Sequence, residues 1–208
     1  MKPNAIIFDL GKVLVDFDYG IAARKIAARC PDGLCDVRQL IEASPLLYRY
    51  ETGLLTTDLF FAEVRRASGF AGDQAEFGKM FADIFSPIEP MIELQAAFRA
   101  QGIPTYIFSN TNELAVRHIR ARFPFFSNFT GYVLSYEHGS MKPDARIYEV
   151  VERVTGHRGD GIVYLDDRPE NIAGGAVRGW RTILYETPER SRQALQEMGM
   201  LPDSLTER

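Results

Sequence analysis

The sequence predicts an α/β protein with a parallel sheet and a small helical cap inserted after the first strand. Five short segments are apolar or β-branched and are bounded by turn residues, which is typical of buried strands. They are residues 5–10, 103–108, 131–135, 161–165 and 180–184. Helical spacing of apolar residues follows at 90–101, 113–122, 144–155 and 171–178. Strands that alternate with helices in this way form a parallel sheet covered on both faces.

A helical block interrupts this alternation and contains no convincing strand. Its expected helices are residues 21–29, 37–50, 58–67 and 74–85. Thr56, Thr57 and Asp58 form an N-cap cluster before the third of these helices. Ligands of open α/β sheets bind outside the carboxyl ends of the strands, so a block placed after the first strand is expected to cover the site. We therefore expect a core of residues 1–15 and 86–208 and a cap of residues 16–85.

Composition narrows the class of protein. The 208 residues carry a net charge of -4 and no dense basic run, which argues against a nucleic-acid partner. Asp9 interrupts the first apolar run, and no window approaches the ~20 apolar residues that cross a membrane. Cys30 and Cys35 are too few for a zinc site, so we expect incidental thiols in a reduced, cytoplasmic protein. The oligomeric state stays open.

Polar residues stand where the expected core strands end, or in the loops that follow them. In chain order they are Asp9, Ser109, Asn110, Lys142, Asp166 and Asp167. Each alone has a plain structural explanation, such as a turn, a helix cap or a solvated lysine. Because the carboxyl ends of parallel strands share one edge of a sheet, their occurrence in this order predicts a single crevice.

In these motifs the chain resembles the haloacid dehalogenase-like hydrolase superfamily over nearly its whole length. The motifs are Phe8-Asp9-Leu10-Gly11-Lys12-Val13, Ser109-Asn110-Thr111-Asn112, Lys142-Pro143-Asp144 and Asp166-Asp167. The chain is most similar to bacterial sugar-phosphate phosphatases that read Asp-Leu-Gly-x-Val, relatives of the N-terminal phosphatase domain of epoxide hydrolases. Their cap pattern is similar to Tyr50-Glu51-Thr52-Gly53 followed by residues 58–61. The resemblance implies a Rossmann-like core and a Mg²⁺-dependent phosphatase.

The resemblance also implies a role for each polar residue. Asp9 would attack phosphorus and form an aspartyl-phosphate, which divides one displacement into two steps. Mg²⁺ would be held by the Asp9 carboxylate, the main-chain carbonyl of Gly11 and Asp167, with Asp166 acting through a water. Few carboxylates, retained waters and phosphate oxygens suit Mg²⁺ better than zinc.

The substrate implied by the resemblance is a small phosphorylated metabolite, such as the sugar phosphate glucose 1-phosphate. Ser109 and the amide N–H of Asn110 would bind its phosphoryl oxygens. Lys142 would neutralise charge on the nucleophile and the transferring group, which is the main work of catalysis in phosphoryl transfer. In the cap, residues 48–50 are expected to face the leaving group.

Position 11 departs from those phosphatases of the superfamily that carry an aspartate there as general acid and base, whereas the Asp-Leu-Gly-x-Val phosphatases share the glycine. Such help is typically worth ~10²–10⁴ in rate. Gly11 leaves three outcomes open. A good leaving group makes the acid less important, another carboxylate (Asp16, Asp18 or Glu51) replaces it, or the protein is a phospho-ligand-binding protein with little turnover.

The same departure raises a second class of enzyme. Haloacid dehalogenases of the superfamily also lack the second aspartate, use no metal and displace halide at carbon. They usually carry a serine–asparagine pair and a later aspartate where this chain has Asp166 and Asp167. Without a cation, these acidic residues would repel the developing negative charge, so the pair favours the phosphatase.

Overall fold

The computed structural model describes residues 3–31 and 36–201. Cys35 lies outside these residues, so the expectation for it is not addressed. Cys30 is a half-buried thiol whose Sγ donates to the carbonyl of Ile26 at 3.2 Å. Within the described ranges, no helix is both long enough and apolar enough to cross a membrane.

Five parallel strands form the central sheet, in the order β5-β4-β1-β6-β7. They are β5 (Gly131–Leu134), β4 (Thr105–Ser109), β1 (Ala5–Phe8), β6 (Ile162–Asp166) and β7 (Arg181–Leu184). β1 lies at the centre, where Phe8 is in register with Ile107 of β4 and Leu165 of β6. The sheet confirms the predicted α/β class with a Rossmann-like parallel core.

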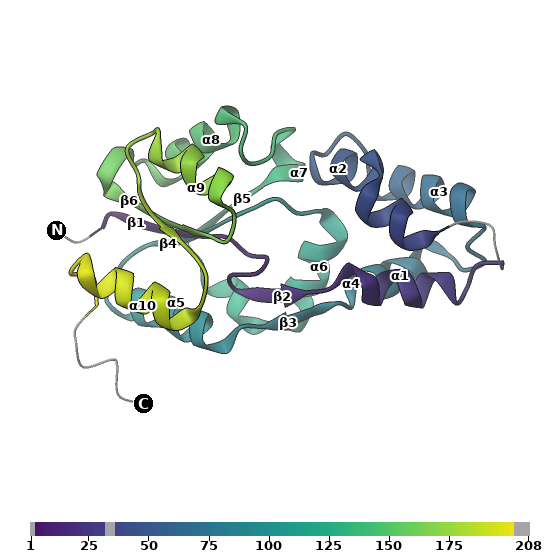
Figure 1. The fold of residues 1–208 in the computed structure, drawn as a ribbon, viewed down its shortest axis with the longest axis horizontal. Helices are drawn as coiled ribbons and strands as arrows, with labels where there is room; N and C mark the ends of the chain where they lie inside the picture. Colours follow the sequence, from purple (N-terminus) through teal and green to yellow (C-terminus); the bar gives the residue numbers. More distant parts are fainter. Residues whose placement is uncertain (1–2, 32–35, 202–208) are drawn as a thin grey trace.

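Helices cover both faces of this sheet, because successive strand residues point to opposite sides. The covering helices are α5 (Glu89–Ala100), α6 (Glu113–Arg122), α8 (Ala145–Thr155), α9 (Pro169–Ala176) and α10 (Pro188–Glu197). Ile6 and Phe8 pack with α5, α6 and α10, whereas Ala5 and Ile7 pack with α8. Figure 1 shows α8 and α9 on one side of the sheet and α5 and α10 on the other.

Four further helices lie beyond the carboxyl ends of the strands, and we refer to them as the cap (Figure 1). They are α1 (Tyr19–Ala27), α2 (Pro45–Glu51), α3 (Thr57–Ser68) and α4 (Gln74–Ala82), with a π-helical turn at Gln39–Ala43. Aromatic rings fill the cap, and Tyr50 stacks on Phe60 with ring centroids 4.3 Å apart. Leu114 of α6 joins this apolar cluster, so cap and core pack together. The exact domain boundaries stay a prediction.

Two short strands lie in and beside the region where no strand is predicted. β2 (Val15–Phe17) pairs antiparallel with β3 (Phe85–Pro87), and Asp16 is opposite Ser86. Three residues are too few to show the alternation that identifies a strand in a sequence. Both chain connections between the sheet and the cap run through this pair, so it fixes how the cap leaves the core.

The helices differ from the prediction at two places. The segment predicted as one helix over 37–50 is divided at Pro45, because the residue before a proline is disfavoured in a helix. Ser44 is extended there and caps α2, while Thr56 caps α3 as predicted. The apolar spacing does not reveal α10, whose residues are mostly polar and whose main buried side chain is Leu195. The remaining helical turns are η2 (Pro124–Asn128), α7 (Ser135–His138) and η3 (Gly159–Gly161).

Candidate active site

The ends of three neighbouring strands meet at one edge of the sheet. Asp9 directly follows β1, Ser109 ends β4, and Asp166 ends β6. Because the strands are parallel, these ends face the same side, where a cavity of about 200 Å³ lies between core and cap. With the exception of Asp166, the predicted site residues line this cavity: Asp9, Gly11, Ser109, Asn110, Lys142 and Asp167.

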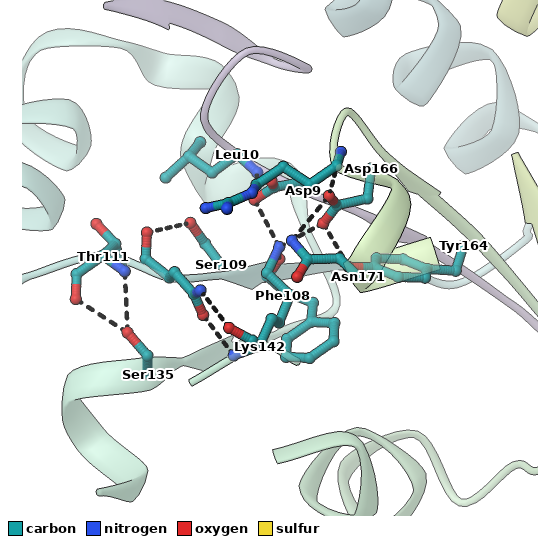
Figure 2. Close-up of polar contacts among 12 residues, drawn as sticks. Asp9, Leu10, Phe108, Ser109, Thr111, Ser135, Lys142, Tyr164, Asp166 and Asn171 are labelled. Atoms are coloured by element: carbon teal, nitrogen blue, oxygen red, sulfur yellow. Dashed lines mark hydrogen bonds and ion pairs between the residues drawn. The ribbon is translucent and has the colours of Figure 1, made fainter. Parts of the chain in front are cut away.

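Lys142 is a buried cation placed between two carboxylates. Figure 2 shows its ammonium group between Asp9 and Asp166, at 3.0 Å from Oδ1 of Asp9 and 2.6 Å from Oδ2 of Asp166. It also donates to the carbonyl of Phe108 at 3.0 Å. Burial acts to lower the pKa of Lys142, but the two carboxylates outweigh it and raise the pKa, so the side chain stays charged.

Asp166 lies behind the cavity and has both carboxylate oxygens bound by protein donors. Oδ2 accepts from Lys142 and from the hydroxyl of Tyr164, and Oδ1 accepts from Nδ2 of Asn171 and the main-chain N–H of Arg168, both at 2.9 Å. Burial acts to raise the pKa of Asp166, yet these donors, Lys142 above all, hold the pKa below its ordinary value. This arrangement suits Asp166 to hold Lys142 in place.

The loop after β4 is tied to two other loops of the core. The side chain of Asn110 accepts from the main-chain N–H of Lys142 at 2.7 Å and donates to its carbonyl at 2.9 Å. The N–H of Thr111 donates to Oγ of Ser135 at 2.9 Å. The Asn110 amide is used in this way, so its main-chain N–H remains as a group that could meet an anion, as could the buried hydroxyl of Ser109, which donates to the Asn110 carbonyl at 3.3 Å.

The three clustered carboxylates of the site have one buried cation, Lys142, beside them, because the two other cations at the cavity are paired with carboxylates outside it. One oxygen from each of Asp9, Asp166 and Asp167 lies within 4.8 Å of the others. Burial raises the pKa of Asp9 against the opposing effect of Lys142, and burial together with Asp166 raises the pKa of Asp167. A divalent cation would supply the missing charge, and oxygen donors suit Mg²⁺. Asp9, Asp167 and the main-chain carbonyl of Gly11 could hold it.

An aromatic ring fills the space beside Gly11 where a second carboxylate was expected. A Cβ built on Gly11 would lie 2.8 Å from Cε1 of Phe17, so the ring would have to move to admit a side chain. Phe17 belongs to β2 and lines the cavity. The main chain of this turn is also unusual, because Lys12 has a positive φ of 61°.

Of the three carboxylates considered as a replacement for this acid, only Glu51 lines the cavity. The side chain of Asp16 is 59% exposed, and its ion pair with Lys12 at 2.5 Å holds its pKa below the ordinary value. Asp18 caps α1 by accepting from the N–H of Gly20 at 2.7 Å. Asp16 and Asp18 are therefore explained by local structure.

Glu51 ends α2 and is partly buried where the cap meets the core. The hydroxyl of Tyr19 donates to its Oε1 at 3.4 Å. Burial raises the pKa of Glu51 to about 7, against the opposing effects of the Tyr19 hydrogen bond, the nearby Asn112 amide and the charge of Arg168. The carboxyl group can therefore hold or release a proton near neutral pH.

Glu51→Gln is expected to stabilise the protein at alkaline pH more than at acidic pH. A raised pKa means that the folded state holds the proton more tightly than the unfolded state. The protonated Glu51 side chain therefore stabilises the folded state fully at pH values below the pKa that Glu51 has in the unfolded chain. This stabilisation is lost as the pH rises through about 7. Glutamine does not titrate, so we expect the gain in free energy of unfolding to be about 2 kcal/mol larger at about pH 8 than at about pH 5.

Urea denaturation at the two pH values measures this difference. Asp16→Asn is the matched control, because its carboxylate is exposed and has a lowered pKa, so no alkaline gain is expected. An effect of Glu51→Gln that is the same at both pH values would contradict the raised pKa.

Some cap residues lie elsewhere than expected. The expectation that residues 48–50 face the leaving group is wrong for the two tyrosines, since Tyr48 is 57% exposed and Tyr50 is buried away from the cavity. The hydroxyl of Tyr50 bonds to Thr57 at 2.7 Å and accepts from the N–H of Leu114. Tyr50 thus joins the cap to α6, while Glu51, its neighbour in sequence, reaches the cavity.

Three further residues support the site, and no role was predicted for them from the sequence. Tyr164 is two residues before Asp166 on β6 and so points to the same face of the strand. Asn171 lies in the first part of α9, directly after this strand end, and Ser135 directly follows β5. The rule that polar groups gather at strand ends would have identified Ser135, and strand alternation would have identified Tyr164.

The parallel sheet, the cap and the carboxylate cluster at the strand ends define an α/β protein with an acidic site under a helical cap. The chain belongs to the haloacid dehalogenase-like hydrolase family, whose model matches residues 3–179. The mouse protein acyl-CoA dehydrogenase family member 10 is 25% identical in an alignment of 209 positions that covers 94% of this chain. The match spans only 19% of the length of that mouse protein.

Solved structures share this fold. A HAD family enzyme from Bacteroides thetaiotaomicron, in complex with magnesium and inorganic phosphate, superposes with a TM-score of 0.79 at 20% identity, covering 88% of this chain and 94% of that chain. L-2-haloacid dehalogenase from Xanthobacter autotrophicus, with chloropropionic acid covalently bound, gives a TM-score of 0.62 at 15% identity and covers 98% of this chain and 86% of that chain. At these identities the likeness concerns the fold.

Proposed function

We propose that this hydrolase is a Mg²⁺-dependent phosphomonoesterase that acts on a small phosphorylated metabolite, with a sugar phosphate such as glucose 1-phosphate as its kind of substrate. The observation that carries the proposal is the carboxylate cluster at the cavity, with Lys142 bound to Asp9 and with Asp167 beside it. A dianionic phosphoryl group needs positive charge at such a place, and Lys142 alone does not balance the three carboxylates.

Asp9 is the proposed nucleophile. The N–H of Leu10 at 2.6 Å and the ammonium group of Lys142 at 3.0 Å both bind Oδ1, so neither engages Oδ2. Oδ2 can then bond to phosphorus and form an aspartyl-phosphate, which water hydrolyses in a second step. The two contacts hold the carboxylate in one orientation, which removes part of the entropic cost of reaching the transition state.

The rest of the cavity suits the transferring group. Lys142 would offset negative charge on the nucleophile and the phosphoryl oxygens, while Ser109 and the N–H of Asn110, which line the cavity, would bind those oxygens. When bound by Asp9, Asp167 and the carbonyl of Gly11, Mg²⁺ would add positive charge that polarises the phosphoryl group. The cavity of about 200 Å³ suits a small substrate.

The same charges disfavour dehalogenation. A dehalogenase expels a halide ion, and the buried Asp166 and the cavity-lining Asp167 would repel that developing charge unless a cation neutralised them. The magnesium and phosphate bound by the similar enzyme from Bacteroides thetaiotaomicron support the phosphatase for this chain. The dehalogenase from Xanthobacter autotrophicus shares the fold, so the two classes must be separated by experiment.

Phosphate release from para-nitrophenyl phosphate and from glucose 1-phosphate tests the proposal. We expect release with Mg²⁺, loss of release to background in EDTA, and recovery when Mg²⁺ is added in excess. The physical reason is that the buried carboxylates and a phosphate dianion cannot share the cavity without added positive charge.

Three other results would contradict the proposal. Halide release from a haloacid in EDTA would establish the dehalogenase. Calorimetric binding of phosphate esters without any release would establish a binding protein. Phosphate release that EDTA does not reduce would exclude the proposed metal dependence.

A further inference from the structure

We infer that Glu51 of the cap is the general acid and base that position 11 lacks. The inference rests on the proposed phosphatase function and adds to it a proton donor from a different layer of the protein. It explains how a chain with glycine at position 11 can turn over substrates whose leaving oxygen needs a proton.

Glu51 lines the cavity from the cap, which is the layer where an in-line leaving group is expected. Phosphoryl transfer places the attacking and leaving oxygens roughly in line, so the leaving oxygen points away from Asp9. Asp9 projects from the end of β1, whereas Glu51 ends α2 in the cap beyond the strand ends (Figure 1). Both side chains line the same cavity, together with Leu47 and Tyr19 from the cap.

The main chain at Glu51 is fixed to the core. Its carbonyl accepts from Oγ of Ser135 at 2.5 Å, and the same hydroxyl accepts from the N–H of Thr111 beside the proposed phosphate loop. Two residues later, Gly53 has a φ of 73°, and a Cβ there would overlap the main-chain oxygen of Tyr136. The end of α2 is thus pressed against the core, which places Glu51 at a defined position in the cavity.

The surroundings of Glu51 set its pKa in the range that acid–base catalysis requires. The hydroxyl of Tyr19 of α1 donates to the carboxyl group, and Arg168 after β6 adds positive charge. Burial outweighs these effects and raises the pKa of Glu51 to about 7, so both forms are populated near neutral pH. The other charged residues that line the cavity are Asp9, Lys12, Lys142 and Asp167.

Over the two steps, Glu51 gives up one proton and regains one. In the first, the bond from Oδ2 of Asp9 to phosphorus forms, the bond from phosphorus to the leaving oxygen breaks, and Glu51 gives its proton to that oxygen. In the second, the Glu51 carboxylate takes a proton from water as the water oxygen bonds to phosphorus and the bond to Asp9 breaks. Inorganic phosphate leaves, and Asp9 and Glu51 return to their starting forms.

A series of aryl phosphates, from dinitrophenyl phosphate to unsubstituted phenyl phosphate, tests this role in wild type and in Glu51→Gln. Single-turnover release of the phenol measures the first step. We expect Glu51→Gln to slow phenyl phosphate by ~10²–10⁴-fold and dinitrophenyl phosphate by less than about tenfold, because only the poorer leaving group needs the proton. With dinitrophenyl phosphate, the variant should give a burst equal to the enzyme concentration and then slow turnover, since water attack on the aspartyl-phosphate has lost its base.

Two further measurements separate catalysis from structure. In wild type, the first step with phenyl phosphate should slow as the pH rises above about 7, and this decline should be absent from Glu51→Gln. Glu51→Asp should recover part of the rate and retain the decline. Glu113→Gln is the matched control, because Glu113 also lies where cap and core meet, bonded to Thr57 at 2.5 Å, yet does not line the cavity.

The outcomes distinguish the inference from the function on which it rests. Equal losses on both substrates, or no loss and an unchanged pH profile, would overturn the role of Glu51 while leaving an Asp9-dependent phosphatase in place. If wild type releases no phosphate through Asp9, the proposed function fails and the inference fails with it.

Discussion

Asp9→Asn is expected to abolish phosphate release while the protein stays folded and its phosphate-binding groups stay in place. The amide cannot form the bond to phosphorus, so the two-step route is closed, and a loss of ~10⁴-fold or more in kcat is expected. Folding should persist, because asparagine keeps the size of the side chain and its oxygen can still accept from the N–H of Leu10. Lys142 also keeps its bond to Asp166.

Steady-state phosphate release measures the loss, and thermal unfolding with calorimetric binding of inorganic phosphate checks the fold and the site. Asp16→Asn makes the same chemical change on an exposed carboxylate outside the cavity and should retain full activity. Phosphate release by Asp9→Asn within tenfold of wild type would exclude an aspartyl-phosphate on Asp9.

The parts of the site that the sequence reveals are those governed by one geometric rule. Asp9, Ser109 and Asp166 could be placed together because parallel strands bring their carboxyl ends to one edge. The same rule does not choose among Asp16, Asp18 and Glu51, since all three belong to the inserted region and their directions depend on tertiary packing. In the structure, the neighbouring residues show that Glu51 lines the cavity and that Asp16 and Asp18 do not.

Local sequence patterns do not predict the direction of a side chain when its contacts come from a distant part of the chain. Tyr50 and Glu51 are adjacent in sequence, but Tyr50 turns into the aromatic core of the cap and Glu51 into the cavity. Helix geometry separates successive residues by about 100°, so one face can be identified only when the neighbouring helices are known. β2 and β3 were missed for a related reason, because each is defined by its partner at the other end of the cap.

Phe17 gives a physical reason for the glycine at position 11. The ring of Phe17 takes the space that a side chain at position 11 would need, so restoring an aspartate there requires the wall of the cavity to change. An acid supplied by the cap, at Glu51, avoids this conflict. With Glu51 as the acid, the cap supplies both the proton and the residues expected to contact the leaving group, because Glu51, Leu47 and Tyr19 all come from the cap.

Lys142→Met is expected to cost both activity and stability. Lys142 is 4% exposed and is the ammonium group that binds Asp9 and Asp166, so methionine leaves a buried carboxylate without its cation. Breaking a buried ion pair from one side typically costs about 3–5 kcal/mol, and we expect a loss of this size in the free energy of unfolding. Phosphate release should fall at least ~10²-fold, because positive charge is lost where the transition state is most negative.

The matched control is Lys25→Met, which removes a Lys–Asp pair of similar length in exposed surroundings, 2.8 Å from Lys25 to Asp83. Exposed pairs contribute about 0–1 kcal/mol, so this variant should lose little stability and no activity. Denaturation in urea with EDTA compares the two variants without any contribution from a bound cation. Equal, small losses in both variants would show that Asp166 does not depend on Lys142. A large loss confined to Lys142→Met would show that the site's charge balance is also part of what holds the core together.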